Sequence, residues 1–374
     1  MKKKKILFIV TEDWYFISHR LNLAKYLMKK GFEVCVCCKD TGKAIDIKRN
    51  GIFFFPLSID RKSLSFIKFF RESLTIISII KKVKPEIVHL ISMRPIIIGT
   101  LSTLFAKSKF CATFTGMGFL FIKKNYKILF FRKIIIFYLK VFLKLNNLFF
   151  IVQNKDDEIF FKSIFSLNKK NLKVIRGSGI DINYFKYYEE ISKAKVRLSY
   201  AGRILDDKGI LCLIASYKVA KAKHQNLELY MAGPLDEKNP SSVSKKYFKR
   251  LITFKDIHYL GNIKNMKKFW QHSDIAILLS KREGLPLSLL EAAATGRAII
   301  STDVTGSREI AINNYNSINI KVGDIQECSN AILRLAKNKT LREKYGKNSR
   351  KIVEGDMALE QVNYQYYSLY KDII

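Results

Sequence analysis

Two glutamates eight residues apart, Glu283 and Glu291, are the side chains best suited to chemistry on a bound ligand. A buried apolar run precedes Glu283, and Pro286 fits the first turn of a helix, where its missing N–H costs no hydrogen bond. The backbone amides of that turn have no acceptor within the helix and attract phosphate or hydroxyl oxygens. Glu291 falls one and a half turns into the helix, where its carboxylate can accept hydrogen bonds from a diol.

A second group of residues, Gly202, Arg203 and Lys208, follows another short apolar run. The run ends at Gly202, and the two cations flank a short loop that opens a helix. Arginine offers a planar fork and lysine a point charge, so the pair can neutralise a diphosphate. In so basic a chain, two ordinary surface cations are the competing interpretation of this pair taken alone.

Short apolar runs bounded by turn residues alternate with helical patterns along the chain, which predicts βαβ units and parallel sheets. One series of expected strands covers residues 6–10, 33–38, 52–57, 86–91, 110–113, 148–152 and 172–175, and a second covers 196–201, 227–232, 258–260, 275–279 and 298–301. Open parallel sheets bind ligands at the carboxyl ends of their strands. Both groups of candidate residues are therefore expected at such an edge.

A chain of 374 residues accommodates two α/β domains. Hydrophobic periodicity is poor from 178 to 195, which we interpret as a hinge between a Rossmann-like domain at 1–177 and a second one at 196–355. Residues 356–374 form a segment rich in Tyr and Leu. We expect this segment to be a helix that packs back on the first domain.

The net charge is +35, from 67 Lys and Arg against 32 Asp and Glu. This imbalance favours an anionic partner such as nucleic acid, an acidic membrane surface or a phosphorylated substrate, although a biased genomic composition is the competing explanation. The six cysteines lack the paired spacing of a structural zinc site and indicate reduced core residues, which favours the cytosol. Neither a signal peptide nor a transmembrane run is expected.

A helical pattern from Tyr126 to Asn146 carries Lys133, Lys140 and Lys144 as one narrow stripe on an otherwise apolar cylinder. Residues 101–150 contain nine basic side chains and no acidic one. This pattern predicts a helix that seats part of its surface on an anionic bilayer. The alternative is an ordinary packed helix whose lysines extend to water.

The two motifs together resemble a known family. The Gly202-Arg203-x4-Lys208-Gly209 element, followed about 75 residues later by Glu283-x7-Glu291, is similar to the donor site of the retaining family 4 glycosyltransferases. Those enzymes adopt the GT-B fold, an α/β architecture in which two Rossmann-like domains face each other across a cleft. Weaker similarities follow in the family's order at Glu86–His89, Val174–Asp181, Met231–Gly233, Tyr259–Gly261 and Gly306–Glu309.

The resemblance implies roles for the two domains and for single residues. The second domain would bind the nucleotide sugar, with Arg203 and Lys208 on the diphosphate, Glu283 on the hydroxyls of the transferred sugar and Glu291 on the ribose. Arg203, Lys208 and Glu283 would be the catalytic residues. The two cations would meet the charge on the departing UDP and so lower the barrier without a metal or a cofactor. The other donor-binding positions would be Gly202, Gly284, Leu285, Pro286 and Leu287.

Two segments depart from the family pattern. Many members have a glycine-rich loop after the first strand, where this chain has Thr11 to Arg20, and a His after the fifth strand, where it has Thr115-Gly116. Both departures resemble the branch that builds bacterial surface glycans on polyprenyl-diphosphate carriers. The first domain would then bind the acceptor through His19, Arg20, Thr115 and Gly116, although a lone His at a helix start is more often a cap or a packed side chain.

The expected function is transfer of a hexose or N-acetylhexosamine from a UDP-sugar to a lipid-linked or surface-polysaccharide glycan. The enzyme is expected to lie peripherally on the cytoplasmic face of the cell membrane, with no nucleic-acid partner. A GT-B-fold sugar-nucleotide epimerase is the nearest alternative. A basic nucleic-acid-binding protein explains the charge, but it leaves the paired motifs unexplained, and no RNA-binding signature or zinc-finger spacing is present.

Overall fold

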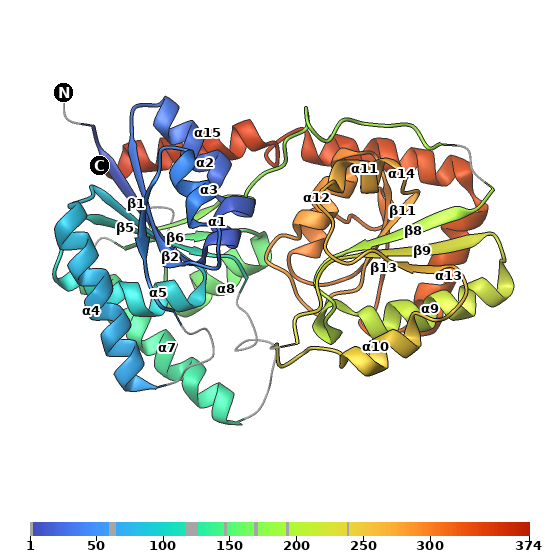
Figure 1. Cartoon of the computed structure of the whole chain (residues 1–374), viewed down its shortest axis with the longest axis horizontal. Coiled ribbons are helices and arrows are strands. Elements are labelled where there is room, and N and C mark those ends of the chain that lie inside the picture. The colour runs from blue at the N-terminus through green and yellow to red at the C-terminus, as the bar shows by residue number, and fades with distance from the viewer. Residues whose placement is uncertain are drawn as a thin grey trace. The chain divides into compact units, whose positions relative to one another are not determined.

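The computed structural model describes residues 3–59, 65–116, 126–145, 148–167, 171–191, 194–237 and 239–374, without the side chains of 127, 128, 144 and 145. It divides into two compact units, which are described separately. Unit 1 comprises Met1–Ser178 and Val362–Ile374, and unit 2 comprises Gly179–Gln361. Both units are α/β, as the sequence predicts, and each is built around one parallel sheet (Figure 1).

Unit 1 contains a parallel sheet of seven strands in the order β3-β2-β1-β4-β5-β6-β7. Helices cover both of its faces, so the central strands are almost continuously apolar. The chain steps outward from β1 to β3 and then returns beside β1 with β4, which makes a topological switch between β1 and β4. The strands are β1 (Lys5–Glu12), β2 (Glu33–Lys39), β3 (Phe53–Pro56), β4 (Ile87–Ile91), β5 (Lys109–Phe114), β6 (Leu148–Val152) and β7 (Leu172–Val174).

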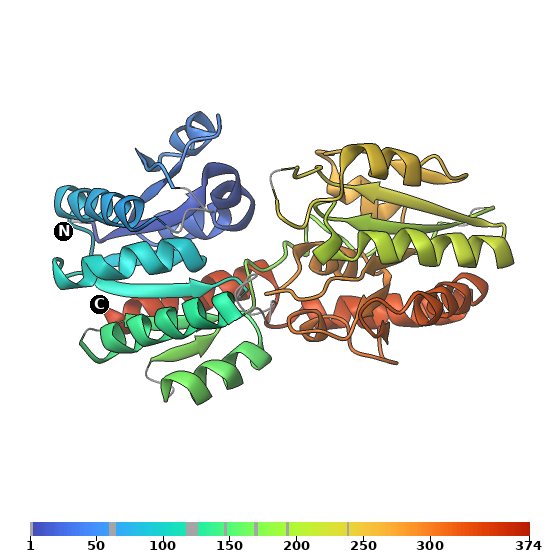
Figure 2. The ribbon, with the colours of Figure 1, turned by 90° about the horizontal axis from the view of Figure 1, so that it is seen from below.

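The helices of unit 1 form two layers, and each layer closes a separate apolar core against the sheet (Figure 2). One face is covered by α4 (Phe66–Val83), α5 (Met93–Thr100) with the short η1 (Leu101–Leu104), α7 (Tyr126–Leu145) and α8 (Lys155–Phe165). The other face is covered by α1 (Asp13–His19), α2 (Leu21–Lys29), α3 (Ala44–Arg49) and the end of α15 (Leu359–Ile373). None of the described helices is both long and apolar enough to cross a bilayer.

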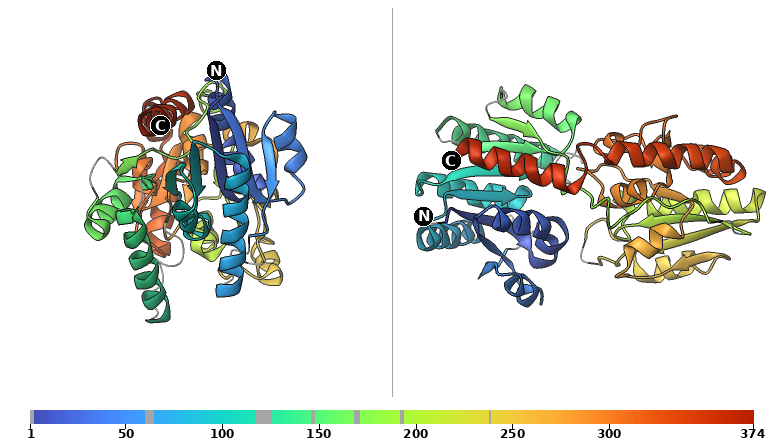
Figure 3. Two further views of the ribbon diagram at one scale, coloured as in Figure 1. Left: turned by 90° about the vertical axis from the view of Figure 1, so that its left-hand side faces the viewer. Right: turned by 90° about the horizontal axis from the view of Figure 1, so that it is seen from above.

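The C-terminal helix α15 runs along unit 1 (Figure 3), and a buried chain of hydrogen bonds ties it to the first sheet. The Tyr370 hydroxyl lies 2.6 Å from Nδ1 of His89, and Nε2 of His89 lies 2.6 Å from the Thr113 hydroxyl. Burial holds the pKa of His89 well below its ordinary value, so the imidazole is neutral. His89 therefore serves as a polar anchor inside the core, and α15 completes unit 1.

Unit 2 contains a parallel sheet of six strands in the order β10-β9-β8-β11-β12-β13. Its strands are β8 (Val196–Ala201), β9 (Leu227–Ala232), β10 (Ile257–Tyr259), β11 (Ile275–Leu278), β12 (Ala298–Thr302) and β13 (Ser317–Ile320). The predicted strands match the observed ones within two residues at each end, but β13 was not predicted. Its sequence, Ser-Ile-Asn-Ile, offers two apolar residues at the edge of the sheet and so lacks an apolar run.

The helices of unit 2 pack on both faces of this sheet around one apolar core. They are η2 (Asp206–Lys208), α9 (Ile210–Lys223), α10 (Lys245–Leu251), α11 (Met266–Gln271), α12 (Leu287–Ala294), η3 (Ser307–Glu309), α13 (Ile325–Lys337) and α14 (Lys339–Val353).

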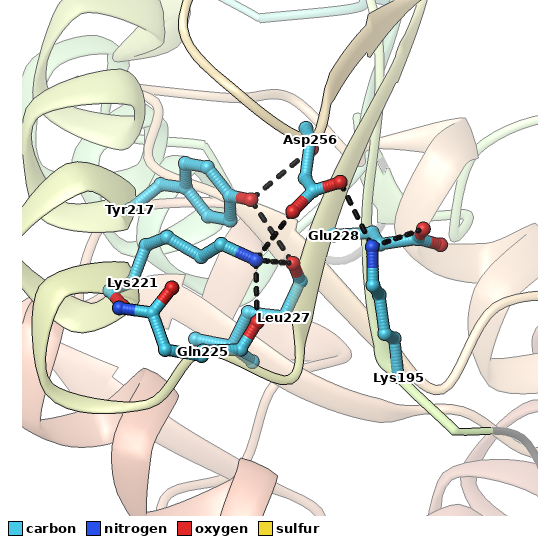
Figure 4. A network of polar contacts seen from close by, with 7 residues as sticks. All are labelled: Lys195, Tyr217, Lys221, Gln225, Leu227, Glu228 and Asp256. Atoms are coloured by element: carbon cyan, nitrogen blue, oxygen red, sulfur yellow. Dashed lines mark hydrogen bonds and ion pairs between the residues drawn. The ribbon is translucent and has the colours of Figure 1, made fainter.

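An ion-pair network joins α9 to the amino ends of three strands of unit 2 (Figure 4). The buried Lys221 ammonium donates to Oδ2 of Asp256 at 2.5 Å and to the Leu227 carbonyl at 2.8 Å. Lys195 approaches Asp256 at 2.9 Å and Glu228 at 3.5 Å. Hydrogen bonds from Lys221 and Lys195 lower the pKa of Asp256 to about 2. The network lies at the opposite edge of the sheet from the candidate ligand-binding residues, which indicates a structural role.

Candidate active site

The candidate donor residues lie at the topological switch of unit 2. Strands β8 and β11 are neighbours, but the chain leaves β8 toward β9 and leaves β11 toward β12, on the other side. Loops that follow such a pair diverge from the carboxyl edge of the sheet, which is where open α/β sheets bind ligands. Residues 202–209 follow β8 and residues 279–286 follow β11, so the two motifs noted in the sequence share one location.

The two loops meet in an ion pair between Lys208 and Glu283. The Lys208 ammonium donates to Oε1 of Glu283 at 2.5 Å, and the Ser280 hydroxyl donates to the same oxygen at 2.5 Å. The side chains of Lys208 and Glu283 are 23% and 10% exposed. Because two donors hold it and little water reaches it, the Glu283 carboxylate has a fixed position.

A second set of contacts joins the same two loops. The Lys281 ammonium lies 2.6 Å from Oδ2 of Asp206, and the Lys281 amide donates to the Asp207 carbonyl at 2.9 Å. Gly209 has a φ of +73°, and a Cβ there would lie 2.1 Å from the Leu279 carbonyl oxygen. Only glycine permits this approach, so the glycine after Lys208 fixes the distance between the loops.

The loop after β12 supports Glu283 from the other side. The Glu283 amide donates to the Thr305 carbonyl at 3.0 Å, so this amide is not open to a ligand. Gly306 has a φ of +79°, and a Cβ there would lie 2.5 Å from the Gly284 carbonyl oxygen. The glycine of the Gly306–Glu309 motif is therefore required for packing beside the site.

Helix α12 begins at Leu287, with Pro286 immediately before it in an extended conformation. The sequence predicts Pro286 inside the first turn, and the structure places it one residue earlier, as the cap. The amides of Leu287 and Ser288 are still suited to bind ligand oxygens, as expected. They stand in the first turn and have no carbonyl a full turn before them inside the helix. Leu285 packs against the core of unit 2 and so orients this turn.

Arg203 extends from the loop after β8 and is paired with an acid that the sequence did not single out. Its Nη1 atom donates to Oδ2 of Asp236 at 3.0 Å, and its side chain is 40% exposed. The backbone beneath it is held firmly, because the Tyr200 hydroxyl donates to the Arg203 carbonyl at 2.7 Å and the Gly202 amide donates to the Ala232 carbonyl at 2.9 Å. The guanidinium can thus change partner on a rigid base.

Glu291 lies in α12, where the buried Trp270 of α11 orients its carboxyl group. The indole Nε1 donates to Oε2 of Glu291 at 2.9 Å. Burial raises the pKa of Glu291 to about 7, and the hydrogen bond from Trp270 opposes that rise. A carboxyl group with this pKa changes its charge near neutral pH, and a ligand that donates hydrogen bonds to it favours the ionised form.

The acceptor-side candidates lie at the carboxyl edge of the sheet in unit 1. His19 stacks on Tyr15 with 4.4 Å between the ring centroids, and burial and the charge of Arg20 lower its pKa to about 4. His19 is therefore neutral at pH 7. Arg20 is only 1% exposed, and its guanidinium carbon lies 5.3 Å from the centroid of the Tyr366 ring. In this conformation Arg20 is a packed residue that an acceptor does not reach, whereas His19 is half-buried.

Thr115 and Gly116 follow β5 at the same edge and are half-buried. The Thr115 hydroxyl lies 3.1 Å from the hydroxyl of Ser92, which follows β4 with a positive φ of 77°. Met117 and Gly118, the next residues of this segment, lie outside the described residues. The acceptor-side role of Thr115 and Gly116 remains a prediction.

Three residues that hold the donor-side candidates were missed by the sequence analysis: Ser280, Asp236 and Trp270. Asp236 contacts Arg203 from 33 positions along the chain and Trp270 contacts Glu291 from 21 positions, so spacing within one motif could not reveal these two. The one available signal was Ser280, which stands just ahead of Glu283 in the same loop.

A possible metal-binding group occurs away from this site. Among the described residues, ligand atoms of Glu228, Asp256 and His258 lie within 4.8 Å of one another. Lys195 already contacts both Asp256 and Glu228, so an ammonium group supplies the positive charge there. The expectation that the protein needs no metal remains a prediction.

Comparison with known proteins agrees with this geometry. The family model described as glycosyl transferases group 1 matches residues 186–352, and the one described as glycosyl transferase 4-like matches residues 5–152. A glycosyltransferase structure from Rickettsia africae superimposes with a TM-score of 0.77 at 19% identity, covering 100% of this chain and 99% of that chain. The protein is a glycosyltransferase of the GT-B fold.

The structure of HepE from Anabaena in complex with UDP and glucose superimposes on this chain with a TM-score of 0.77 at 14% identity. The match covers 98% of this chain and 99% of that chain. A capsular polysaccharide biosynthesis glycosyltransferase of Staphylococcus aureus is 24% identical over 100% of this chain and 98% of its own length. A Campylobacter jejuni N-acetylgalactosaminyltransferase, named for a diphospho-undecaprenol-linked sugar, is 25% identical over 89% and 92%. These relatives are transferases, which does not favour the epimerase alternative.

Proposed function

We propose that the glycosyltransferase moves a hexose or N-acetylhexosamine from a UDP-sugar to a polyprenyl-diphosphate-linked glycan, with retention of the anomeric configuration, as the resemblance to family 4 implies. The contact between Lys208 and Glu283 at the switch of unit 2 carries this proposal. It brings together a cation suited to a diphosphate and a carboxylate suited to sugar hydroxyls. A transferase needs both groups at the bond that breaks.

The donor fits the charges of the site in a definite way. The Lys208 ammonium has three N–H donors, and its contact with Glu283 occupies one of them, so the others can meet a phosphate oxygen. Arg203 can exchange Asp236 for the diphosphate, because its side chain is partly exposed. Glu291 accepts hydrogen bonds from the ribose hydroxyls while Trp270 holds the other side of its carboxyl group.

Catalysis is mainly electrostatic in this scheme. The bond between the sugar and the diphosphate breaks, and negative charge grows on the departing UDP. Lys208 and the first-turn amides of α12 are held in place before the donor binds, and Arg203 turns from Asp236 to the diphosphate as the donor binds. At the bond-breaking step these groups then stabilise the charge without further reorganisation. Glu283 orients the sugar through its hydroxyls, and its own negative charge lies beside a sugar ring that becomes more positive as the bond breaks.

The acceptor assignment draws on the relatives. The Campylobacter jejuni enzyme and a galactosyltransferase of Escherichia coli are both named for sugars linked to undecaprenol through a diphosphate. The Escherichia coli enzyme is 24% identical over 95% of this chain and 93% of its own length. A lipid-linked acceptor requires the enzyme to work at a membrane surface, so we propose a peripheral position on the cytoplasmic face.

The test is to incubate the purified protein with a panel of nucleotide sugars and a short-chain polyprenyl-diphosphate sugar, and to measure the released nucleotide. We expect release from one UDP-sugar that depends on the acceptor, and a product whose anomeric coupling in NMR matches the donor. Near-wild-type kinetics in both Arg203→Ala and Glu283→Gln would overturn the site assignment. Binding to a random oligonucleotide at moderate salt, but not to UDP, would favour the nucleic-acid alternative.

A further inference from the structure

Helices α4 and α7 run in the same direction on one face of the sheet in unit 1. Each connects the carboxyl end of one parallel strand to the amino end of the next strand in the sequence, so both run against the strands. Helix α5 lies between them against the sheet, and the first turns of α4 and α7 extend to the same side of the unit (Figures 1 and 3). The two helices meet where Phe69 and Tyr138 approach, with 6.5 Å between the ring centroids.

The first turns of α4 expose large apolar side chains. Phe66 and Ile67 are 77% and 82% exposed, and Phe70 and Leu74 are also exposed. Ile67, Phe70 and Leu74 recur at helical spacing and form one stripe. The opposite side of α4 is in the core, where Ile76 is fully buried. The helix is therefore apolar on its outer face as well as on its inner face, which packing in the unit does not explain.

Helix α7 repeats this arrangement. Tyr126, Phe130, Ile134 and Phe137 are exposed and form one stripe, with Phe137 at 70%. Its inner side is docked, because Leu139 is buried. The eight exposed residues on the two helices are called the α4–α7 face: Phe66, Ile67, Phe70, Leu74, Tyr126, Phe130, Ile134 and Phe137. Monomeric soluble proteins seldom expose so many large apolar side chains on two adjoining helices.

Among the described side chains of α4 and α7, the exposed charges have one sign. Lys133 and Lys140 are exposed on α7, and Arg71 and Lys81 are exposed on α4. Helix α7 contains no acidic residue, and the one acid of α4, Glu72, is buried and accepts a hydrogen bond from Arg94 at 2.7 Å. The side chain of Lys144, the third lysine of the predicted stripe, lies outside the described residues. An apolar face on two helices whose exposed charges are all cations matches a surface that is apolar inside and anionic outside.

We propose that the α4–α7 face docks on a lipid bilayer that carries anionic headgroups, with its aromatic and aliphatic side chains below the headgroups and its cations among the phosphates. Amphipathic helices bind in this manner through their apolar area and through attraction to anionic lipids. The inference rests on the proposed lipid-linked acceptor for its purpose, because docking brings unit 1 to the membrane that contains that acceptor. Its physical basis, the exposed residues and their charge, is independent of the reaction.

The experiment is co-sedimentation of the full chain with two kinds of vesicle. One is phosphatidylcholine alone, and the other contains about 30% phosphatidylglycerol, an anionic fraction large enough to attract basic segments. We expect binding to the anionic vesicles that weakens in high salt. The combined variant Phe66→Ser, Ile67→Ser and Phe137→Ser should bind more than tenfold more weakly. The variant Lys133→Glu with Lys140→Glu should also lose more than tenfold, but only on anionic vesicles.

A matched control replaces three exposed apolar residues outside the face, in the variant Ile45→Ser, Tyr247→Ser and Ile312→Ser. It should bind anionic vesicles like the wild type. Equal vesicle binding by the wild type and the Phe66, Ile67 and Phe137 variant would overturn the proposal, provided that both show the same circular dichroism melting curve. The proposal would also be overturned if the wild type were a dimer in light scattering and bound no vesicles, while this variant were a monomer. The face would then be an interface between two copies of the chain.

Nucleotide release with a water-soluble, short-tailed acceptor separates this inference from the proposed function. None of the replaced residues belongs to the active site, so all variants should release UDP at the wild-type rate from the soluble acceptor. If the protein binds vesicles as expected but releases no nucleotide from any UDP-sugar, the proposed function fails while the docking face stands. If nucleotide release is normal and vesicle binding is absent, the docking inference alone fails.

Discussion

The Lys208 ammonium and the Glu283 carboxylate lie 2.5 Å apart although 75 residues separate them, because β8 and β11 are neighbours in the sheet of unit 2. The pair joins the two loops at the switch of that sheet. The charge of each partner therefore affects how strongly the other interacts with a ligand, and kinetics of the variants can measure this effect.

Replacing Lys208 with Ala should lower kcat by about 10²–10³-fold, because it removes one preorganised donor from the charge that grows on the departing UDP. The affinity for the UDP-sugar should fall less, since the intact donor does not yet carry that charge. Steady-state kinetics with the preferred donor measures both quantities. Lys339→Ala, a surface lysine 3.7 Å from Glu343, is the matched control and should leave kcat unchanged.

Glu283→Gln should lower kcat and alter which sugar is accepted, because its carboxylate is assigned to the transferred ring. The double variant Lys208→Ala with Glu283→Gln should lose less activity than the product of the two single losses, since each single change leaves the other partner of a half-buried ion pair without its counter-charge. A double-mutant cycle on kcat measures this coupling. Losses that multiply would show that the two residues act independently.

The KM of the UDP-sugar should rise as the pH falls below about 7. The pKa of Glu291 is raised to about 7, so protonation below that value removes the carboxylate that accepts hydrogen bonds from the ribose. Glu291→Gln should have a raised KM that no longer depends on pH in this range, with kcat nearly unchanged. Trp270→Phe removes the hydrogen bond that lowers this pKa and should shift the KM profile to higher pH.

The same carboxyl group affects stability in a known direction. Its pKa is higher in the folded protein than the ordinary value of 4.5, so ionisation opposes folding progressively from pH 4.5 to 7 and fully above pH 7. Glu291→Gln should therefore be more stable than the wild type at pH 8, by at most about 3 kcal/mol. Thermal melts at pH 5 and pH 8 test the sign, and a difference that is larger at pH 5 would contradict it.

Lys221→Met should destabilise unit 2 by about 2–4 kcal/mol, because the Asp256 carboxylate loses a hydrogen bond at 2.5 Å and the Leu227 carbonyl loses its ammonium donor. Lys223→Met on the same helix replaces an exposed lysine and should change stability by less than about 0.5 kcal/mol. Chemical denaturation of both variants gives the comparison. Equal midpoints would show that the buried network contributes nothing.

Activity should be complete in excess chelator, because the proposed donor region has no Asp-x-Asp pair and offers Arg203 and Lys208 to the diphosphate. The cluster of Glu228, Asp256 and His258 lies at the opposite edge of the sheet, so a metal bound there would not meet the donor. Loss of activity that Mg²⁺ or Mn²⁺ restores would contradict this prediction.

Most strands could be predicted from the sequence because each is a short apolar run between turn residues, which is a local property. Strand β13 was missed because Ser317–Ile320 has no such run, and its place was decided by pairing with β12. The motifs indicated the candidate donor residues for the same local reason. Their partners Asp236 and Trp270 come from other loops and helices, so no spacing within the motifs could indicate them.

The sequence by itself determined the α/β class, the positions of most strands, the donor motifs and the basic stripe of α7, because these depend on residues near one another in the chain. The tertiary structure alone decided that Lys208 meets Glu283, that Arg20 is buried under α15, and that large apolar side chains of α4 and α7 stay exposed. Strand order determines which loops meet, and the packing of each helix determines which of its faces stays in water. Both depend on contacts between residues far apart in the chain, which local patterns do not encode.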